Sequence, residues 1–287
     1  MLKLTIPKKR DFILPITIIS LGITVSYYIN QIYGKLYDAI QNYKPTEAWQ
    51  AIAIFCGLAG IAVLLDSYET YELNKLQVKM RTILIQKLHF NVDTRSETTL
   101  PQRIQEDTIK YCQTNIELGT AFFKAAVKIP LFIGVITTLT NWWTGLIVLV
   151  SVILGTLLTK WISKSLVMAR SEYESAEAYL RHNFSSMLLF PLKAYILTVD
   201  TYHKYNKELK KLTLLSGGLG QIFVLLPFML LLPLYFAGTL TLGSFFQSVK
   251  ALDKIISSLS VVIDNRNTMT VNLTAKNRLI ELTKQSK

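Results

Sequence analysis

The chain has 287 residues, of which 51% are hydrophobic and only 17% are charged, and its 31 Lys and Arg against 19 Asp and Glu give a net charge of +12. This composition excludes an ordinary soluble domain and is typical of a protein embedded in a membrane. All but four of the basic residues fall in 3–10, 75–110, 160–211 and 250–287. Such clustering indicates orientation in a membrane, not nucleic-acid binding.

Six apolar stretches are about long enough to cross a bilayer as a helix, which takes about 20 residues. They are residues 12–33, 48–68, 119–139, 142–162, 216–236 and 245–264. No small-residue cleavage site follows the first stretch, so we interpret it as a retained span and not as a signal peptide. The connections 41–49, 139–145 and 236–244 contain a single basic residue, Lys44. We therefore expect these connections outside and both termini in the cytoplasm.

Helical sequence continues past the inner ends of the apolar stretches. Residues 49–89 contain no Gly or Pro after Gly60, which predicts one helix of about 40 residues, and 142–189 read the same way. We expect an all-α membrane protein of six long helices with cytoplasmic extensions, forming a single domain over residues 1–287.

A polar row runs along the third predicted helix. Its members are separated by three, four or seven residues and so share one face: Glu106, Lys110, Gln113, Glu117, Lys124 and Lys128. Lys124 and Lys128 lie inside the apolar stretch, where an ionisable group costs at least about 2.5–3.5 kcal/mol. The row predicts a water-filled pathway; structural ion pairing or snorkelling to the interface is the alternative.

Polar rows on other helices extend this pattern. The sixth span carries Gln247, Lys250 and Lys254 on one face with Asp253 beside them, and the second carries Asp66, Glu69 and Glu72. As substrate-cavity residues we predict Gln113, Lys124, Lys128, Gln247, Lys250, Asp253 and Lys254. As a proton pathway we predict Glu106, Asp107, Glu117, Glu177, Asp66, Glu69 and Glu72, because carboxylates in series are what a proton relay needs. For Glu72, Glu106, Asp107 and Glu177, a solvated helix face is an equal alternative.

Chemistry of other kinds has no motif in this sequence. No catalytic triad, metal cluster or phosphate-binding loop occurs, so we expect no enzyme activity, no cofactor and no metal. Cys56 and Cys112 stand far apart and are expected to be buried small hydrophobic residues.

Five segments in order along the chain resemble motifs of the SbmA/BacA peptide transporters, which are related to the membrane domains of peroxisomal-type ABC exporters. Residues 101–108 (PQRIQEDT), with Gln102 and Arg103, resemble the family's QR(V/I)QEDT. Residues 36–41 (LYDAIQ), with Tyr37 and Asp38, look like its FYDLIQ. The others are 177–181 (EAYLR), 237–243 (AGTLTLG) and 277–279 (NRL).

The resemblance implies the type-IV transmembrane fold of ABC exporters without a nucleotide-binding domain, as a homodimer with a shared central cavity. It implies import of peptides, antimicrobial ones included, across a bacterial inner membrane, driven by protons on an acidic ladder. Glu106 and Glu177 match ladder positions, whereas the next ladder position falls at Ile116, beside Glu117. The family's extra N-terminal membrane segment is expected to have no counterpart in this chain.

The expected partners are a second copy of the chain, a peptide substrate and membrane lipid. Two other functions stay open. The chain could be the membrane subunit of an ATP-driven transporter, with a separate ATPase docking on 91–102 and 184–194. It could also be a non-transporting receptor or immunity protein built on the same scaffold.

Overall fold

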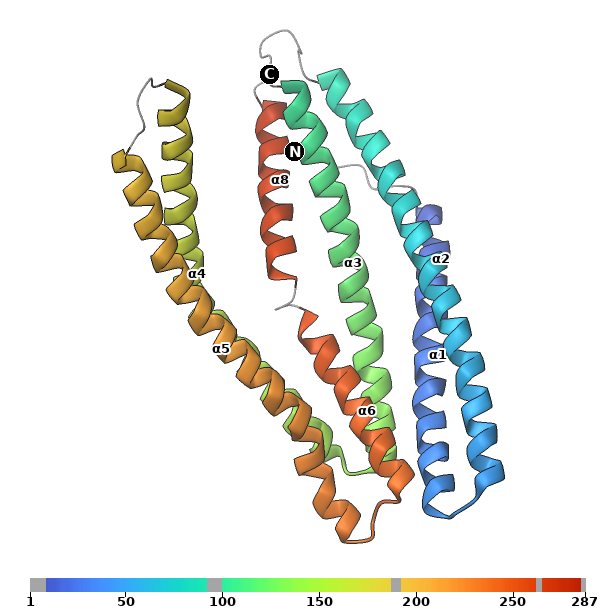
Figure 1. Cartoon of the computed structure of the whole chain (residues 1–287). Helices are drawn as coiled ribbons and strands as arrows, with labels where there is room; N and C mark the ends of the chain where they lie inside the picture. The colour runs from blue at the N-terminus through green and yellow to red at the C-terminus, as the bar shows by residue number, and fades with distance from the viewer. Residues whose placement is uncertain (1–8, 92–99, 187–191, 262–264, 285–287) are drawn as a thin grey trace. The chain divides into compact units, whose positions relative to one another are not determined.

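The computed structural model describes residues 9–91, 100–186, 192–261 and 265–284, which form helices joined by short turns. The helices are α1 (Lys9–Gln41), α2 (Pro45–Asn91), α3 (Leu100–Leu139), α4 (Trp142–Ser186), α5 (Leu192–Phe236), α6 (Leu242–Leu259) and α8 (Arg266–Lys284) (Figure 1). The predicted all-α fold is confirmed.

The helices are much longer than the apolar stretches within them. α2 has 47 residues and α4 has 45, which corresponds to about 70 Å of helix at 1.5 Å per residue. The hydrocarbon core of a bilayer is about 30 Å thick. These helices are thus long enough to extend beyond the membrane, and their cytoplasmic extension stays a prediction.

Four segments of the described chain are long and apolar enough to cross a membrane: Arg10–Gln41, Pro45–Leu88, Gln105–Leu139 and Leu192–Phe236. Their most apolar windows are at most 22% buried in the protein, so most of these apolar side chains face outward, as they do in lipid. The chain is thus a multi-pass membrane protein. The stretches 142–162 and 245–264 stay predictions as spans.

The sixth predicted span is shorter as a helix than expected. α6 has 18 residues and ends at Leu259, where the backbone N–H of Ser260 donates to the Ile256 carbonyl. Residues 262–264 of the predicted span lie outside the described residues.

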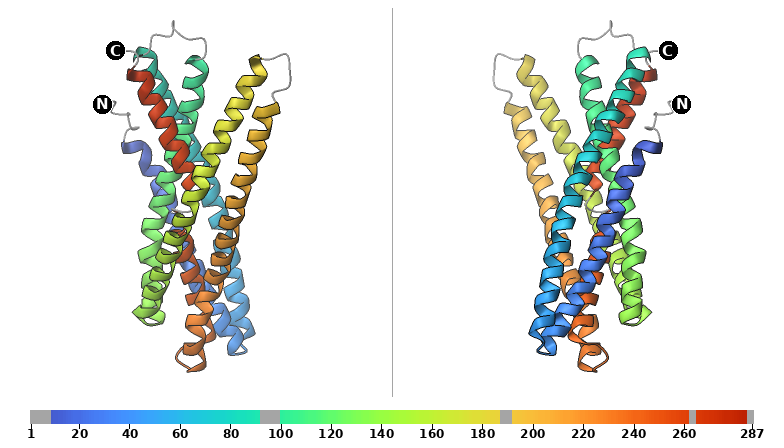
Figure 2. Two further views of the ribbon diagram at one scale, coloured as in Figure 1. Left: turned by 90° about the vertical axis from the view of Figure 1, so that its left-hand side faces the viewer. Right: turned by 90° about the vertical axis from the view of Figure 1, so that its right-hand side faces the viewer.

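The residues divide into two compact units, 1–145 with 231–287, and 146–230. In the first unit α1 packs on α2 and α6, and α3 packs on α6, α8 and α2. The turns after α1, after α3 and before α6 lie at the same end of this unit in both figures (Figures 1 and 2), which agrees with their predicted common side. The single-domain prediction is not tested by this division.

The second unit is a hairpin of α4 and α5. Glu208 accepts a hydrogen bond from the Ser165 hydroxyl at 2.9 Å. Lys204 Nζ lies 2.6 Å from the Glu172 carboxylate, and the Tyr173 ring stacks on Tyr205. Polar and aromatic contacts therefore join α4 and α5 in their more polar halves.

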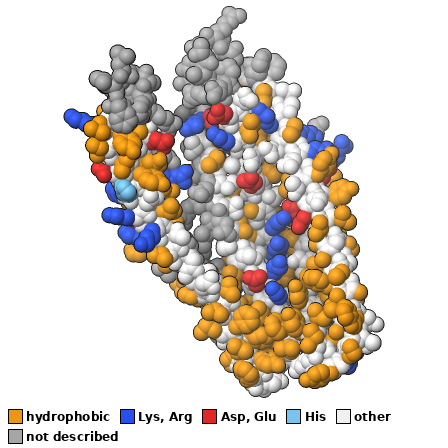
Figure 3. Space-filling model, viewed as in Figure 1, with side chains coloured by type: hydrophobic (Ala, Val, Ile, Leu, Met, Phe, Trp, Pro, Cys, Tyr) orange, Lys and Arg blue, Asp and Glu red, His pale blue; other side chains and the backbone are white. Residues whose placement is uncertain are grey.

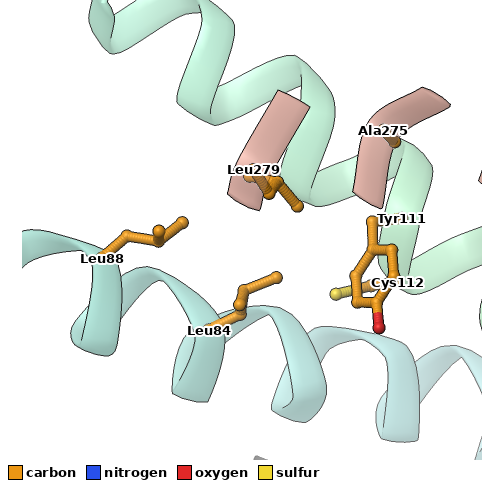
Figure 4. Close-up of a cluster of buried hydrophobic side chains, with 6 residues drawn as sticks. All are labelled: Leu84, Leu88, Tyr111, Cys112, Ala275 and Leu279. Atoms are coloured by element: carbon orange, nitrogen blue, oxygen red, sulfur yellow. The ribbon is translucent and has the colours of Figure 1, made fainter. Parts of the chain in front are cut away.

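A hydrophobic cluster joins α2, α3 and α8 (Figure 4). It consists of Leu84, Leu88, Tyr111, Cys112, Ala275 and Leu279. Cys112 is buried there, as predicted, but Cys56 is exposed. The reason is that Cys56 belongs to the apolar stretch of α2, whose side chains mostly point away from the protein.

Two of the family-like segments meet where the end of α1 lies beside the start of α6. The Asp38 carboxylate accepts a hydrogen bond from the backbone N–H of Gly243 at 2.8 Å, and the Gln41 side chain accepts one from Leu242 at 2.7 Å. These bonds satisfy N–H groups of the first turn of α6, which have no partner within the helix. The Tyr37 ring stacks on Phe246 at 4.0 Å. Residues 36–41 thus fasten α1 to the start of α6.

Candidate functional site

A cavity of about 390 Å³ lies within the first unit, bounded by α1, α2, α3 and α6. Its charged lining residues are Asp66 and Glu69 of α2, Lys124 and Lys128 of α3, and Lys250, Asp253 and Lys254 of α6. Figure 3 shows Lys and Arg side chains in a strip with Asp and Glu beside them, above a surface that is largely hydrophobic. The cavity is therefore a charged site on otherwise apolar helices.

Helical spacing explains how each helix contributes more than one charge. Lys124 and Lys128 are four residues apart, and so are Lys250 and Lys254, whereas Asp66 and Glu69 are three apart. Residues with these separations lie above one another on a helix surface. Once one member of a pair faces the cavity, the other does too.

One ion pair connects two walls of the cavity. Lys124 Nζ lies 2.6 Å from Glu69 Oε1, with side chains that are 33% and 12% exposed. Each group neutralises the other, which lowers the cost of keeping both within apolar helices. For Lys124, the structure thus supports the ion-pairing alternative that the sequence left open.

Lys128 differs from Lys124. The described residues place no carboxylate within 4.0 Å of its ammonium group, although Asp66 and Glu69 are close enough to act on it electrostatically. Lys254 and Lys124 act on it with the opposite sign. Lys128 therefore lies close to two other positively charged side chains, Lys124 and Lys254.

The wall formed by α1 was not anticipated from the sequence. Asn30 is 3% exposed, and its Nδ2 donates to the backbone carbonyl of Gln247 at 3.0 Å. The Tyr33 ring lies under Lys250, whose Nζ is 5.8 Å from the ring centroid. Ser26, Asn30 and Tyr33 form a polar row at spacings of four and three in an apolar stretch, and this row was the signal that could have located the wall.

Two predicted cavity residues lie elsewhere. The Gln247 side chain is held against Gly34 of α1, in the interface between α1 and α6. Gln113 donates a hydrogen bond to the Glu117 carboxylate at 3.1 Å on an exposed part of α3. Gln113, Glu117 and Gln247 are all outside the cavity lining. Eleven residues separate Gln113 from Lys124 and Glu117 from Lys128, so each pair shares a face of α3. At 1.5 Å per residue the members of each pair nevertheless lie about 16 Å apart along the helix, which leaves Gln113 and Glu117 outside the cavity lining.

The remaining proton-pathway candidates lie outside the cavity lining. Glu106 lies 3.6 Å from Lys110, and Glu72 lies 3.3 Å from Lys75. Asp107 is buried, with its carboxylate 3.6 Å from Arg278 of α8. Glu177 is half-buried on α4 in the other unit. Gln102 and Arg103 belong to α3, but their side chains lie outside the described residues.

The pairing of Asp107 with Arg278 connects two further family-like segments. Asp107 belongs to residues 101–108, and Arg278 belongs to residues 277–279. Asn272 of α8 also donates to the Thr114 hydroxyl at 2.8 Å. These segments hold α8 against α3.

Comparison with protein families agrees with this architecture. A family model described as ABC transporter transmembrane region 2 matches residues 2–188, about two thirds of the chain. The chain belongs to this family. The family includes the SbmA/BacA transporters and the peroxisomal ABC transporters. The matched part carries Asp66, Glu69, Lys124 and Lys128, whereas the cavity residues of α6 follow it. This protein is thus the transmembrane region of an ABC-type transporter.

Proposed function

We propose that this protein imports peptides, antimicrobial ones included, across a bacterial inner membrane, as a homodimer driven by the proton gradient. The observation that carries the proposal is the charged cavity on α1, α2, α3 and α6. Placing seven ionisable side chains on apolar helices that cross a membrane is costly, and such groups in membrane proteins commonly mark substrate or ion pathways. A peptide, with polar backbone and two charged ends, suits a lining that carries both signs of charge.

Proton coupling is supported by the carboxylates of the cavity. Asp66, Glu69 and Asp253 line it, and carboxylates in series are what a proton relay needs. Glu106 and Glu177 correspond to ladder positions of the SbmA/BacA family and would extend this route. The same resemblance implies a homodimer, in which two copies of the chain would share the cavity.

The distribution of charge supports the orientation. The turns after α1 and α3 and before α6 carry one basic residue, Lys44, whereas the segments 75–110 and 160–211 and the two terminal regions hold all but four of the Lys and Arg. Cationic segments are retained in the cytoplasm, so both termini are cytoplasmic in this proposal.

Uptake by proteoliposomes tests the proposal. A fluorescent peptide should accumulate with an inward proton gradient and without ATP, and an uncoupler should abolish the accumulation. Glu69→Gln and Asp66→Asn should reduce uptake by at least about tenfold, which is about 1.4 kcal/mol of lost interaction. The matched control is Glu72→Gln, on the same helix but paired with Lys75 outside the cavity lining, which should retain uptake.

Uptake that persists with the uncoupler would contradict proton coupling. Reduced uptake by Glu106→Gln or Glu177→Gln would show that the ladder positions take part. Absence of uptake by the unsubstituted protein, with a cellular phenotype that the acidic variants retain, would favour a non-transporting receptor or immunity protein.

A separate ATPase is the second candidate. The observation that favours it is that Glu106, Glu72 and Glu117 each have a local polar partner outside the cavity, which leaves gaps in a proton ladder. The expected docking segments, 91–102 and 184–194, lie partly outside the described residues. Co-purification of a nucleotide-binding subunit, with uptake that requires ATP, would establish this function in place of proton coupling.

A further inference from the structure

The basic side of the cavity has more charge than its acidic side can neutralise. Four lysines and three acidic residues line it, and Lys124 is already paired with Glu69. Asp66 and Asp253 then face Lys128, Lys250 and Lys254. The cavity therefore holds one positive charge in excess.

The three remaining lysines have no close anionic partner in the described chain. None of them lies within 4.0 Å of a carboxylate, and Lys250 instead lies over the face of the Tyr33 ring. Lys250 and Lys254 are one helical turn apart on α6, and Lys254 is close enough to repel Lys128 of α3. An anion entering here would relieve that repulsion and pair with ammonium groups that are partly removed from water.

From these observations we propose that Lys128, Lys250 and Lys254 form a subsite for the C-terminal carboxylate of the peptide. This inference rests on the proposed peptide transport and specifies which end of the peptide the cavity recognises. Asp66, on the α2 wall, remains available for an ammonium group of the same ligand. The volume of about 390 Å³ is in the range of small-molecule pockets and suits the terminal residues of a peptide.

The subsite predicts different affinities for two ligands that differ in one functional group. A peptide with a free C-terminus carries the carboxylate, and the same peptide as a C-terminal amide does not. Binding of trialanine and trialanine amide to the full-length protein in lipid nanodiscs, measured by calorimetry, should favour the free acid by about tenfold or more. Inorganic phosphate, added as a competitor, shows whether a simple anion occupies the same lysines: weaker binding of trialanine with unchanged binding of the amide supports the subsite.

Substitution of the lysines should remove this preference. In Lys250→Gln/Lys254→Gln, affinity for the free acid should fall to that for the amide, while the amide binds as before. The matched control is Lys110→Gln, whose lysine pairs with Glu106 outside the cavity lining, and it should keep the preference. If the double variant fails to fold, the acid-to-amide ratio in the unsubstituted protein remains decisive.

Equal affinity for acid and amide, or no saturable binding of the acid, would overturn the subsite. Failure of the subsite and failure of transport are distinguishable. Equal uptake of both peptides by proteoliposomes would remove the subsite and leave peptide transport standing. Selective binding of the acid without uptake of either peptide would keep the subsite and remove the transport function.

Discussion

At the scale of single residues, the Lys124–Glu69 pair is the contact on which the charged cavity depends. Its partners come from α3 and α2, and both side chains are mostly buried. Removing one partner leaves the other as an unpaired charge among apolar helices, whereas removing both leaves none. The loss of one charge should therefore cost more than the loss of the pair.

A double-mutant cycle measures this asymmetry. Lys124→Met and Glu69→Gln should each lower the free energy of unfolding by about 1–3 kcal/mol, less than for a fully buried pair, because Lys124 is 33% exposed. The double variant should recover at least half of that loss, as measured by denaturant titration in detergent micelles.

The exposed pair of Lys44 and Glu47, three residues apart, is the control for this cycle. Both side chains are 55% exposed, so the same cycle should give a coupling of about 0.5 kcal/mol or less. Equal coupling in the two cycles would show that the Lys124–Glu69 pair is screened by water as a surface pair is.

At the scale of secondary-structure elements, the fit of α6 against α1 sets the position of one cavity wall. A side chain on Gly243 would overlap the Gly34 carbonyl oxygen and the Asp38 carboxyl group. Backbone approach this close requires glycine. The contact sets the rotation of α6 against α1, and with it the direction in which Lys250 and Lys254 point.

Gly243→Ala should therefore destabilise the protein by about 1–3 kcal/mol, because α6 must move away from α1. Gly34→Ala should cost less, since the added methyl group meets the movable end of the Gln247 side chain. Thermal unfolding in detergent compares the variants.

The matched controls are Gly57→Ala and Gly60→Ala, at helical positions of α2 with no atom within 4 Å of the added methyl group. They should be neutral or raise stability by up to about 1 kcal/mol, because alanine favours a helix over glycine. A similar loss at Gly57 and Gly243 would mean that helix packing is not the cause.

At the scale of the whole molecule, orientation in the membrane follows from the placement of charge. The exposed turn residues Asn42 and Thr239 lie at the end that is almost free of basic residues, whereas Lys276 lies on α8 in the basic C-terminal region. Retention of cationic segments in the cytoplasm predicts opposite sides for these positions.

Cysteine labelling tests this topology. In a background with Cys56→Ala and Cys112→Ala, an impermeant maleimide should label Asn42→Cys and Thr239→Cys on intact cells. Lys276→Cys should be labelled only after the membrane is permeabilised. Labelling of Lys276→Cys on intact cells would reverse the proposed orientation.

The sequence by itself determined the helices, the turns that join them and the membrane character. Apolar stretches of spanning length, and a chain without Gly or Pro after Gly60, are local properties, so α2 could be predicted almost to its ends. The paired lysines of α3 and α6 could also be identified, because helical spacing places each pair on one face.

Only the tertiary structure decided which of these faces meet. The periodicity of a helix specifies its own face but not its rotation or depth against a neighbour, and these depend on contacts such as Gly243 with Gly34. For that reason Lys128 and Lys254 line one cavity with Asn30 and Tyr33 of α1, which the sequence did not single out. For the same reason Gln247 lies in a helix interface, and Glu117 lies outside the cavity lining.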